Sequence, residues 1–184
     1  MTTQVTLPLD SEQALALRCG QEVEISGWVL TGRDVACRKL FELLQSGQPL
    51  PIELRQEVMY FVGPSPALPG QVIGSAGPTT TGRMNRFLPA LLDAGLRGMI
   101  GKGYIDETVK TALAKNQAVY FGAIGGTGAL LSTAIAEVEV VAFEELLSEA
   151  VRRLRLVRFP AVVLHDAHGG DLYAQAAGSA RHEN

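Results

Sequence analysis

Apolar and polar residues alternate along several stretches of the chain, and this alternation predicts β-strands. The clearest example begins with Glu22-Val-Glu-Ile-Ser and continues into the apolar residues up to Leu30. The short apolar run 71–73 is expected to end another buried strand. Further strands are predicted, in chain order, at 5–9, 58–62, 98–101, 118–121, 137–143 and 159–164.

Apolar residues at helical spacing lie between most of these strands. After the strand at 22–30, Ala36, Leu40 and Leu43 share one face of a helix that ends near Gly47. Other helices are predicted at 11–17, 85–94, 106–115, 129–135 and 143–154. The alternation predicts a single α/β domain over residues 1–184, in which the small, polar tail 174–184 is frayed.

The composition fits an ordinary globular domain, with 47% hydrophobic and 19% charged residues among 184. A net charge of −3 gives no basic surface for nucleic acid or for an anionic membrane. No apolar run approaches the roughly 18 residues of a membrane span, and the N-terminus lacks the features of a signal peptide. We therefore expect a cytoplasmic protein without nucleic-acid or membrane partners.

Cys19 and Cys37 are the only cysteines. Two thiols are too few for a disulfide framework in a small domain. An iron–sulfur cluster is usually held by roughly three or four thiolates, so this chain cannot hold one alone. Cys37 itself is expected either in the core or in the lining of a pocket.

The stretch Gly74 to Met84, GSAGPTTTGRM, combines glycines, a proline, threonines and an arginine. A turn of this kind between a strand and a helix presents backbone N–H groups and the positive end of a helix dipole to an anion. Thr79 and Arg83 are four residues apart, so we expect them on one face of the first helical turn. The stretch predicts a pocket for a carboxylate or phosphate with a hydroxyl beside it.

Three basic residues, Arg33, Arg83 and Lys102, are predicted where strands give way to loops or helices. Ligands of α/β folds bind at the ends of strands. The fork of an arginine binds both oxygens of a carboxylate, and the glycines on either side of Lys102 leave room for an anion. Each residue alone could be solvated surface, but the three together favour an anion site.

Two other segments invite a functional interpretation. The turn Gly122 to Gly128 is rich in glycine but lacks the Lys-Ser or Lys-Thr of a phosphate loop, so close packing of the backbone explains it equally well. His165 and His168 flank Asp166 in a predicted hairpin turn, which suggests a metal. With no fourth ligand nearby, they are interpreted as surface residues, and no metal ligand is assigned to this chain.

Four short motifs resemble those of the β subunit, or C-terminal domain, of class I fumarases and L-tartrate dehydratases. They are Gly32-Arg33-Asp34, Gly77-Pro78-Thr79-Thr80-x-x-Arg83-Met84, Gly101-Lys102-Gly103 and Gly122-x-x-Gly125-Gly126. The resemblance extends over about residues 4–173, and it includes Val138-Glu-Val-Val and Phe159-Pro-Ala.

This resemblance implies a swivelling β/β/α domain with a mixed sheet. The domain would close over an α subunit that carries a [4Fe–4S] cluster, in which one iron acts as a Lewis acid. The implied reaction is the reversible hydration of fumarate to malate, with dehydration of tartrate as the alternative. The implied partners are the α subunit and a four-carbon dicarboxylate, and the implied assembly is an oligomer of αβ pairs.

The resemblance also implies roles for individual residues. Thr79 is similar to the base that removes a proton next to a carboxylate, with an aspartate of the α subunit as its partner. Arg33, Arg83 and Lys102 would bind the substrate carboxylates. Cys37 departs from the family pattern Arg-Asp-x-x-His, since it takes the place of the histidine.

Two other functions stay open at this stage. A non-catalytic module that binds dicarboxylates is the second hypothesis, and Cys37 in place of the histidine favours it. A nucleotide-binding domain is the third hypothesis, which rests on the glycine-rich turns alone.

Overall fold

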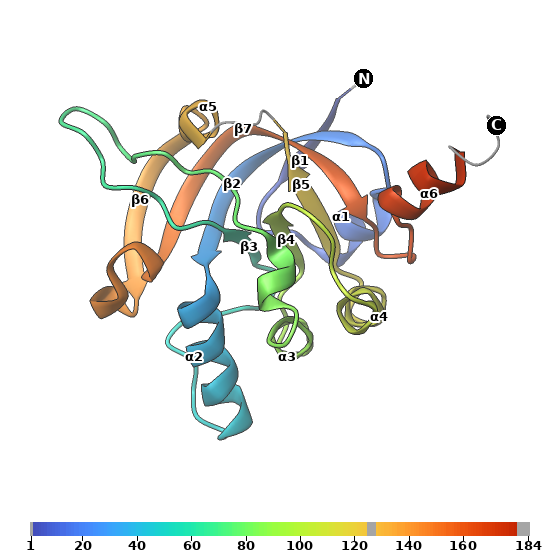
Figure 1. Ribbon diagram of the computed structural model, residues 1–184, viewed down its shortest axis with the longest axis horizontal. Coiled ribbons are helices and arrows are strands. Elements are labelled where there is room, and N and C mark those ends of the chain that lie inside the picture. The colour runs from blue at the N-terminus through green and yellow to red at the C-terminus, as the bar shows by residue number, and fades with distance from the viewer. Residues whose placement is uncertain (1, 125–127, 180–184) are drawn as a thin grey trace.

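In the part of the chain that the structure describes, seven strands form one mixed sheet, shown with its helices in Figure 1. The computed structural model describes residues 2–124 and 128–179. The strands are β1 Thr3–Thr6, β2 Glu22–Gly32, β3 Val58–Phe61, β4 Gly98–Gly101, β5 Val119–Ala123, β6 Ile135–Ala142 and β7 Val151–His165. The helices are α1 Ser11–Ala16, α2 Asp34–Gln45, α3 Leu88–Asp93, α4 Glu107–Lys115, α5 Gly128–Ser132 and α6 Leu172–Ser179, with short 3-10 helices η1 Thr81–Met84 and η2 Glu144–Glu149. The predicted α/β class and mixed sheet are confirmed.

The strand pairings close into a ring. β2, β3, β4 and β5 are parallel neighbours in that order, and the long β7 runs antiparallel to both β5 and β2. β1 extends the sheet beside the first half of β2, and β6 lies beside the first half of β7. Because β2 to β5 are parallel, their carboxyl ends all lie at one edge of the sheet.

Both faces of β3, β4 and most of β5 are buried. In β3, Val58 and Tyr60 belong to an inner cluster to which every strand of the ring contributes, whereas Met59 and Phe61 belong to an outer cluster. The outer cluster includes the apolar faces of α2, α3 and α4, which lie together on one side of the sheet in Figure 1. Strands buried on both faces read as continuous apolar runs, as β3 does.

The predicted helix after β2 and the predicted helix at 106–115 form where their apolar spacing places them. α4 begins after Asp106, whose carboxylate accepts a hydrogen bond of 3.0 Å from the Val109 N–H. This side chain satisfies one of the free N–H groups at the start of the helix. Val109, Ala112 and Leu113 then face the outer core.

Three predicted elements are corrected by the structure. Residues 71–73 form no strand, and Val72 is exposed. The helix predicted at 143–154 is limited to the 3-10 turn η2, because Phe143 and Leu147 have positive φ angles of 53° and 54°, and β7 begins at Val151. The segment expected to fray forms α6 as far as Ser179, and residues 180–184 lie outside the described residues.

Candidate active site

The predicted binding residues follow the carboxyl ends of neighbouring parallel strands. Arg33 comes directly after β2, and Lys102 comes directly after β4. Thr79 is far from β3 in sequence, but its N–H donates a 2.7 Å hydrogen bond to the Phe61 carbonyl at the end of that strand. The parallel topology therefore places these residues along one edge of the sheet, where α/β folds bind ligands.

The loop that carries Thr79 differs from the predicted strand-to-helix turn. The 3-10 helix η1 begins only at Thr81, and the α-helix that follows begins at Leu88. Thr79 therefore precedes the helical turn on which it was expected to stand beside Arg83. Three N–H groups of the loop are already bonded within the chain, those of Thr79 to Phe61 O, Thr81 to Lys102 O and Arg83 to Thr80 O. These three N–H groups are therefore not available to an anion.

Thr79 and Lys102 each have an available polar group. Thr79 is half-buried and Lys102 is exposed. Within residues 2–124 and 128–179, the Thr79 hydroxyl has no hydrogen-bond partner and the Lys102 ammonium forms no ion pair. Thr80 and Lys102 form a parallel β-bridge, so the two available groups belong to adjoining backbone segments.

The local geometry explains why the residues on either side of Lys102 are glycines. A Cβ on Gly101 would lie 2.0 Å from the Thr81 hydroxyl oxygen, which is far inside contact distance. Gly103 has a φ of +80°, which favours glycine. Gly101 therefore lets the Thr79 loop pack directly against β4, and Gly103 lets the chain turn away after Lys102.

Both arginines are held by carboxylates. Asp34 forms an ion pair with Arg83, in which Nε donates a 3.1 Å hydrogen bond to Oδ1 and Nη2 lies 2.9 Å from Oδ2. Arg33 lies 3.9 Å from the Glu149 carboxylate, and its buried Nε has no hydrogen-bond partner among the described residues. These carboxylates orient the guanidinium groups and leave other N–H groups for a ligand.

Sequence reasoning missed the supporting roles of Asp34, Glu149 and Gly63. Asp34 was part of a quoted motif, but nothing local connects it to Arg83. Glu149 comes from η2, far along the chain from Arg33, so only the fold brings the two together. A Cβ on Gly63 would lie 2.3 Å from Nη1 of Arg33, so the guanidinium packs on bare backbone.

Cys37 belongs to the core. Its side chain is fully buried on α2, and Sγ lies 4.0 Å from Sδ of Met59. Burial, together with the nearby Asp34 and Glu149 carboxylates, raises the pKa of the Cys37 thiol far above its usual range. The thiol therefore does not line the candidate site.

The second glycine-rich turn packs against the first. The Ala76 N–H donates a 3.1 Å hydrogen bond to the Gly128 carbonyl, and a Cβ on Gly128 would lie 2.5 Å from the Gly77 nitrogen. Gly128 thus supports the backbone that leads to Thr79. Residues 125–127, including Gly125 and Gly126 of the quoted motif, lie outside the described residues.

His165 and Asp166 are buried, which corrects their interpretation as surface residues, whereas His168 is exposed. The Asp166 carboxylate accepts backbone hydrogen bonds of 2.9 Å from Cys19, His168 and Gly170. The turn leads into α6 instead of a second long strand. Asp166 therefore organises a structural turn.

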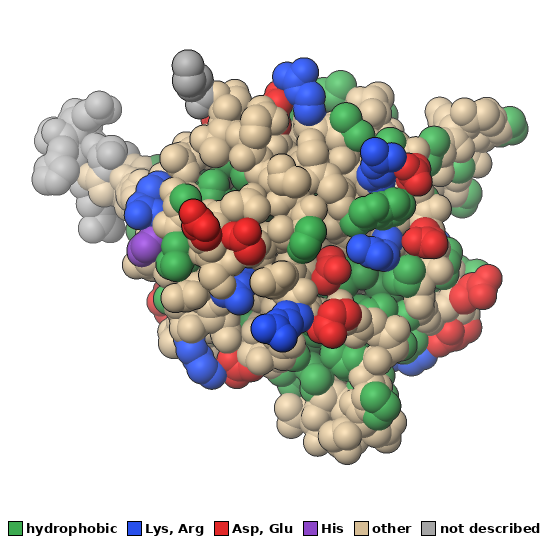
Figure 2. Space-filling model, turned by 180° about the vertical axis from the view of Figure 1, so that it is seen from behind, with side chains coloured by type: hydrophobic (Ala, Val, Ile, Leu, Met, Phe, Trp, Pro, Cys, Tyr) green, Lys and Arg blue, Asp and Glu red, His purple; other side chains and the backbone are tan. Residues whose placement is uncertain are grey.

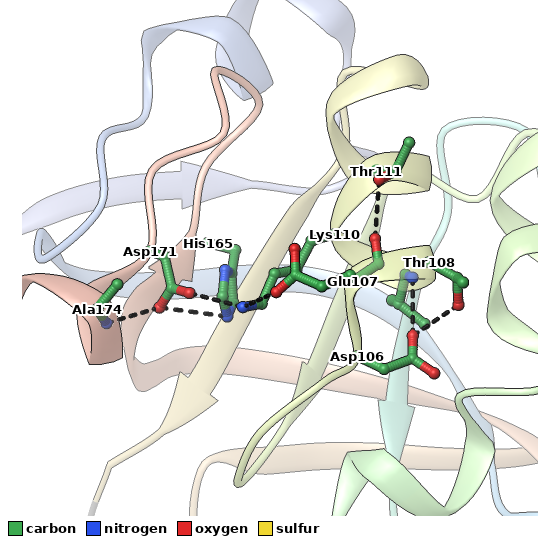
Figure 3. A network of polar contacts seen from close by, with 9 residues as sticks. Asp106, Glu107, Thr108, Lys110, Thr111, His165, Asp171 and Ala174 are labelled. Atoms are coloured by element: carbon green, nitrogen blue, oxygen red, sulfur yellow. Dashed lines mark hydrogen bonds and ion pairs between the residues drawn. The ribbon is translucent and has the colours of Figure 1, made fainter.

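His165 lies at the edge of a polar network shown in Figure 3. Its Nε2 is 3.9 Å from Asp171, which in turn forms a 2.9 Å ion pair with Lys110. Burial lowers the pKa of His165, and this effect outweighs the opposite effect of the Asp171 carboxylate. Burial therefore favours the neutral form of the imidazole.

The residues of this chain do not fit an iron–sulfur cluster. Burial and the carboxylates of Asp166 and Asp171 raise the pKa of Cys19 to about 11, and Cys37 is enclosed in the core, so neither offers a ready thiolate. Within the described ranges, no group of three His, Cys, Asp or Glu residues could hold a metal ion. No cluster ligand is therefore assigned to this chain.

The candidate site is open to solvent along its edge. A hollow of about 350 Å³ lies nearby between the 64–73 loop and the η2 region, and its lining does not include Thr79 or Lys102. The face seen from behind the view of Figure 1 has acidic and basic side chains interspersed (Figure 2). None of the described helices is long and apolar enough to cross a membrane.

Comparison with known proteins places the chain in a family. The model of the fumarase C-terminus matches residues 2–176. The chain is 36% identical over 155 residues to the anaerobic class I fumarate hydratase of Escherichia coli, covering 83% of this chain and 28% of that protein. It is 33% identical over 172 residues to fumarate hydratase 2 of Leishmania major, covering 91% of this chain and 30% of that protein.

A relative of similar length is also found. The chain is 32% identical over 173 residues to a putative L(+)-tartrate dehydratase subunit beta of Methanocaldococcus jannaschii, covering 91% of this chain and 89% of that protein. By contrast, the chain spans less than a third of the length of the fumarate hydratases it matches. The match over nearly the whole chain shows that it belongs to the fumarase C-terminus family.

Proposed function

We propose that this chain is the β subunit of an iron–sulfur hydro-lyase that reversibly hydrates fumarate to malate. The observation that carries the proposal is the pair of available groups, the Thr79 hydroxyl and the Lys102 ammonium, on bridged segments at one edge of the sheet. A half-buried hydroxyl in a folded protein usually has a partner, so the Thr79 hydroxyl without one among the described residues, close to the exposed Lys102 ammonium at a strand end, suggests a ligand. The ligand would be a four-carbon dicarboxylate.

The cations of this edge would bind and orient the dicarboxylate. Lys102 offers three N–H donors, and Arg33 and Arg83 offer the guanidinium N–H groups that their carboxylate partners do not use. Removal of a proton from the carbon next to a carboxylate moves negative charge onto the oxygens of that carboxylate. Cations placed beside those oxygens stabilise the charge as it develops.

Thr79 would be the base that takes this proton. A threonine hydroxyl is a weak base, so a carboxylate must take up its own proton, and the resemblance assigns that carboxylate to the α subunit. The anchored Thr79 N–H, 2.7 Å from the Phe61 carbonyl, holds the residue in place while its side chain stays available. The site of this chain is therefore one half of an active site.

The other half would come from a partner α subunit. The chain covers only 28% of the Escherichia coli fumarate hydratase, and the similarly sized relative is named as a subunit beta. Residues 62–82, which lead to Thr79, carry no charged side chain, and Leu68 and Val72 are largely exposed. An uncharged, exposed loop beside the site is suited to burial against another chain. The α subunit would carry the [4Fe–4S] cluster, which when bound polarises the substrate hydroxyl.

The test is to produce the chain together with its α partner under anaerobic conditions and to measure malate and tartrate dehydration. We expect turnover of malate by the complex and none by this chain alone. Full activity of the isolated chain without a cluster would refute the proposal. Binding of malate by the complex without any turnover would instead establish the non-catalytic binding module.

Dehydration of L-tartrate is the second candidate reaction. The observation that favours it is the coverage of 89% of the putative tartrate dehydratase subunit beta, against 28% of the fumarate hydratase. The same complex decides between the two reactions. A higher kcat/KM for L-tartrate than for malate would assign the chain to tartrate.

A further inference from the structure

Tyr120 connects the two segments that carry the candidate site residues. It lies on β5 and is fully buried. Its hydroxyl oxygen is 2.9 Å from the Thr81 hydroxyl and 2.9 Å from the Gly103 carbonyl. Thr81 lies two residues from Thr79 and two from Arg83, and Gly103 follows Lys102 directly. One phenol therefore contacts both the segment 79–83 and the turn that follows Lys102.

The chemistry of these groups gives the hydrogen bonds a direction. A carbonyl only accepts, so the Tyr120 O–H donates to Gly103. The phenol oxygen is then the acceptor for the Thr81 O–H. Burial raises the pKa of Tyr120, so the phenol keeps the proton that this arrangement needs. The Thr81 N–H also donates to the Lys102 carbonyl at 2.9 Å, which makes a second link between the same segments.

The phenol ring is itself held in place. The His165 ring stacks on it, with centroids 5.8 Å apart and an angle of 13° between the planes. Gly101 leaves room for the Thr81 hydroxyl, since a Cβ there would lie 2.0 Å from it. A side chain that is buried, stacked and bonded at its tip has little freedom to move.

We propose that Tyr120 is a positioning residue that sets the distance between Thr79 and Lys102. The inference rests on the proposed function, in which the proton is removed at one of these groups while a substrate carboxylate binds the other. Displacements of about 1 Å in an active site can cost roughly 100-fold in rate. Loss of the phenol hydroxyl would allow a shift of this kind without removing any group that touches substrate.

The first variant is Tyr120→Phe, which removes the hydroxyl and keeps the ring against His165. In the complex with the α partner we expect kcat for malate to fall by roughly 10- to 100-fold while KM changes less than about 3-fold. Val5→Ala on β1, a buried residue paired with the first half of β2, is the stability control. It should lower the melting temperature with kcat unchanged.

A double-mutant cycle separates positioning from general destabilisation. Thr81→Val removes the other hydroxyl of the bond, and we expect the Tyr120→Phe/Thr81→Val double variant to lose no more kcat than the worse single variant. Independent, multiplicative losses would overturn the proposal. An unchanged kcat in Tyr120→Phe would overturn it as well.

Hydrogen exchange of the full chain without its partner tests the link separately from the reaction. We expect the Thr81 N–H, which bonds the Lys102 carbonyl, to exchange at least about 10-fold faster in Tyr120→Phe. The Leu9 N–H, bonded to Gln56 O elsewhere, should be unaffected. The wild-type complex could dehydrate neither substrate while the Thr81 N–H still exchanges faster in Tyr120→Phe. In that case the proposed function fails and the structural link stands. Equal exchange at Thr81 would refute the link itself.

Discussion

Two segments of this chain carry side chains that could form a functional site. They differ in whether the carboxylate, hydroxyl and ammonium groups of those side chains have partners within the protein. At the 165–171 turn, the Asp166 carboxylate accepts three backbone N–H groups and Asp171 binds Lys110, and only the buried Nε2 of His165 has no hydrogen-bond partner among the described residues. At the edge that carries Thr79 and Lys102, the hydroxyl and the ammonium have no partner within the described residues. Satisfied polar groups hold a fold together, whereas available groups at a strand end can bind a ligand.

The topology explains this difference. β7 is antiparallel to β5, so its carboxyl end and the 165–171 turn lie at the edge where β2 to β5 begin. Arg33, Thr79 and Lys102 lie at the opposite edge, where those strands end. Histidine and aspartate beside a strand therefore indicate a site only if the strand ends at the correct edge.

The largest expected effect tests the available hydroxyl. Thr79→Ala should lower kcat for malate in the αβ complex by about 10²- to 10⁴-fold, because it removes the base. The thermal midpoint should be unchanged, since the Thr79 backbone bond to Phe61 stays. Steady-state kinetics and thermal unfolding measure both outcomes. Thr111→Ala, on the exposed side of α4, is the matched control, and equal activity of the two variants would contradict the assignment.

An intermediate effect compares two lysines, one from each segment. Lys102→Met should raise KM for malate by roughly 10- to 100-fold, since a hydrogen bond to a charged group contributes about 1.5–3 kcal/mol. Lys110→Met removes an ammonium already bound to Asp171 and Glu107, so KM should not change. Initial-rate measurements over a range of malate concentrations distinguish the two. A larger rise in KM for Lys110→Met than for Lys102→Met would contradict the assignment of Lys102 to substrate binding.

The smallest effect on turnover is expected at the structural turn. Asp166→Ala leaves three backbone N–H groups without their acceptor, so the free energy of unfolding should fall by about 2–3 kcal/mol at pH 7 with kcat per folded complex unchanged. Chemical denaturation followed by circular dichroism gives the first quantity. A change in kcat at equal folded concentration would place Asp166 in the active site.

This stability difference should depend on pH. Burial alone would raise the pKa of Asp166, but the N–H donors of Cys19, Gly170 and His168 outweigh it and hold the pKa below its ordinary value of 3.8. A carboxyl whose pKa is lowered by folding stabilises the protein fully above its unfolded pKa and loses this contribution as the pH falls through the folded pKa. The difference in free energy of unfolding between wild type and Asp166→Ala should therefore have its full size at pH 7 and decrease below about pH 4.

Some elements follow from local pattern alone. The alternation at 22–30 and the helical spacing at 106–115 are regular, so β2 and α4 form as predicted. The segment 143–154 also has apolar residues at helical spacing, yet only 144–149 are helical, as the 3-10 helix η2, and 151–154 become the start of β7. There the chain pairs with both β2 and β6, and these long-range contacts outweigh local preference.

The candidate site was likewise predicted only in part. Thr79, Arg33, Arg83 and Lys102 were predicted from motifs, but their roles as base and carboxylate ligands stay predictions. The expectation that free N–H groups of the loop would bind an anion was wrong at Thr79, Thr81 and Arg83, because strand ends and neighbouring turns bind those groups. Cys37, for which core and pocket were both open, lies in the core.

The sequence by itself determined the α/β class, most strands and helices, the family motifs and the residue types at the candidate site. These depend on the period of apolar residues and on short motifs, which are local properties of the chain. Only the tertiary structure decided which edge those residues share, that Asp34 and Glu149 hold the arginines, and that Tyr120 joins Thr81 to Gly103. Such contacts join residues far apart in the chain, and strand order and direction set them.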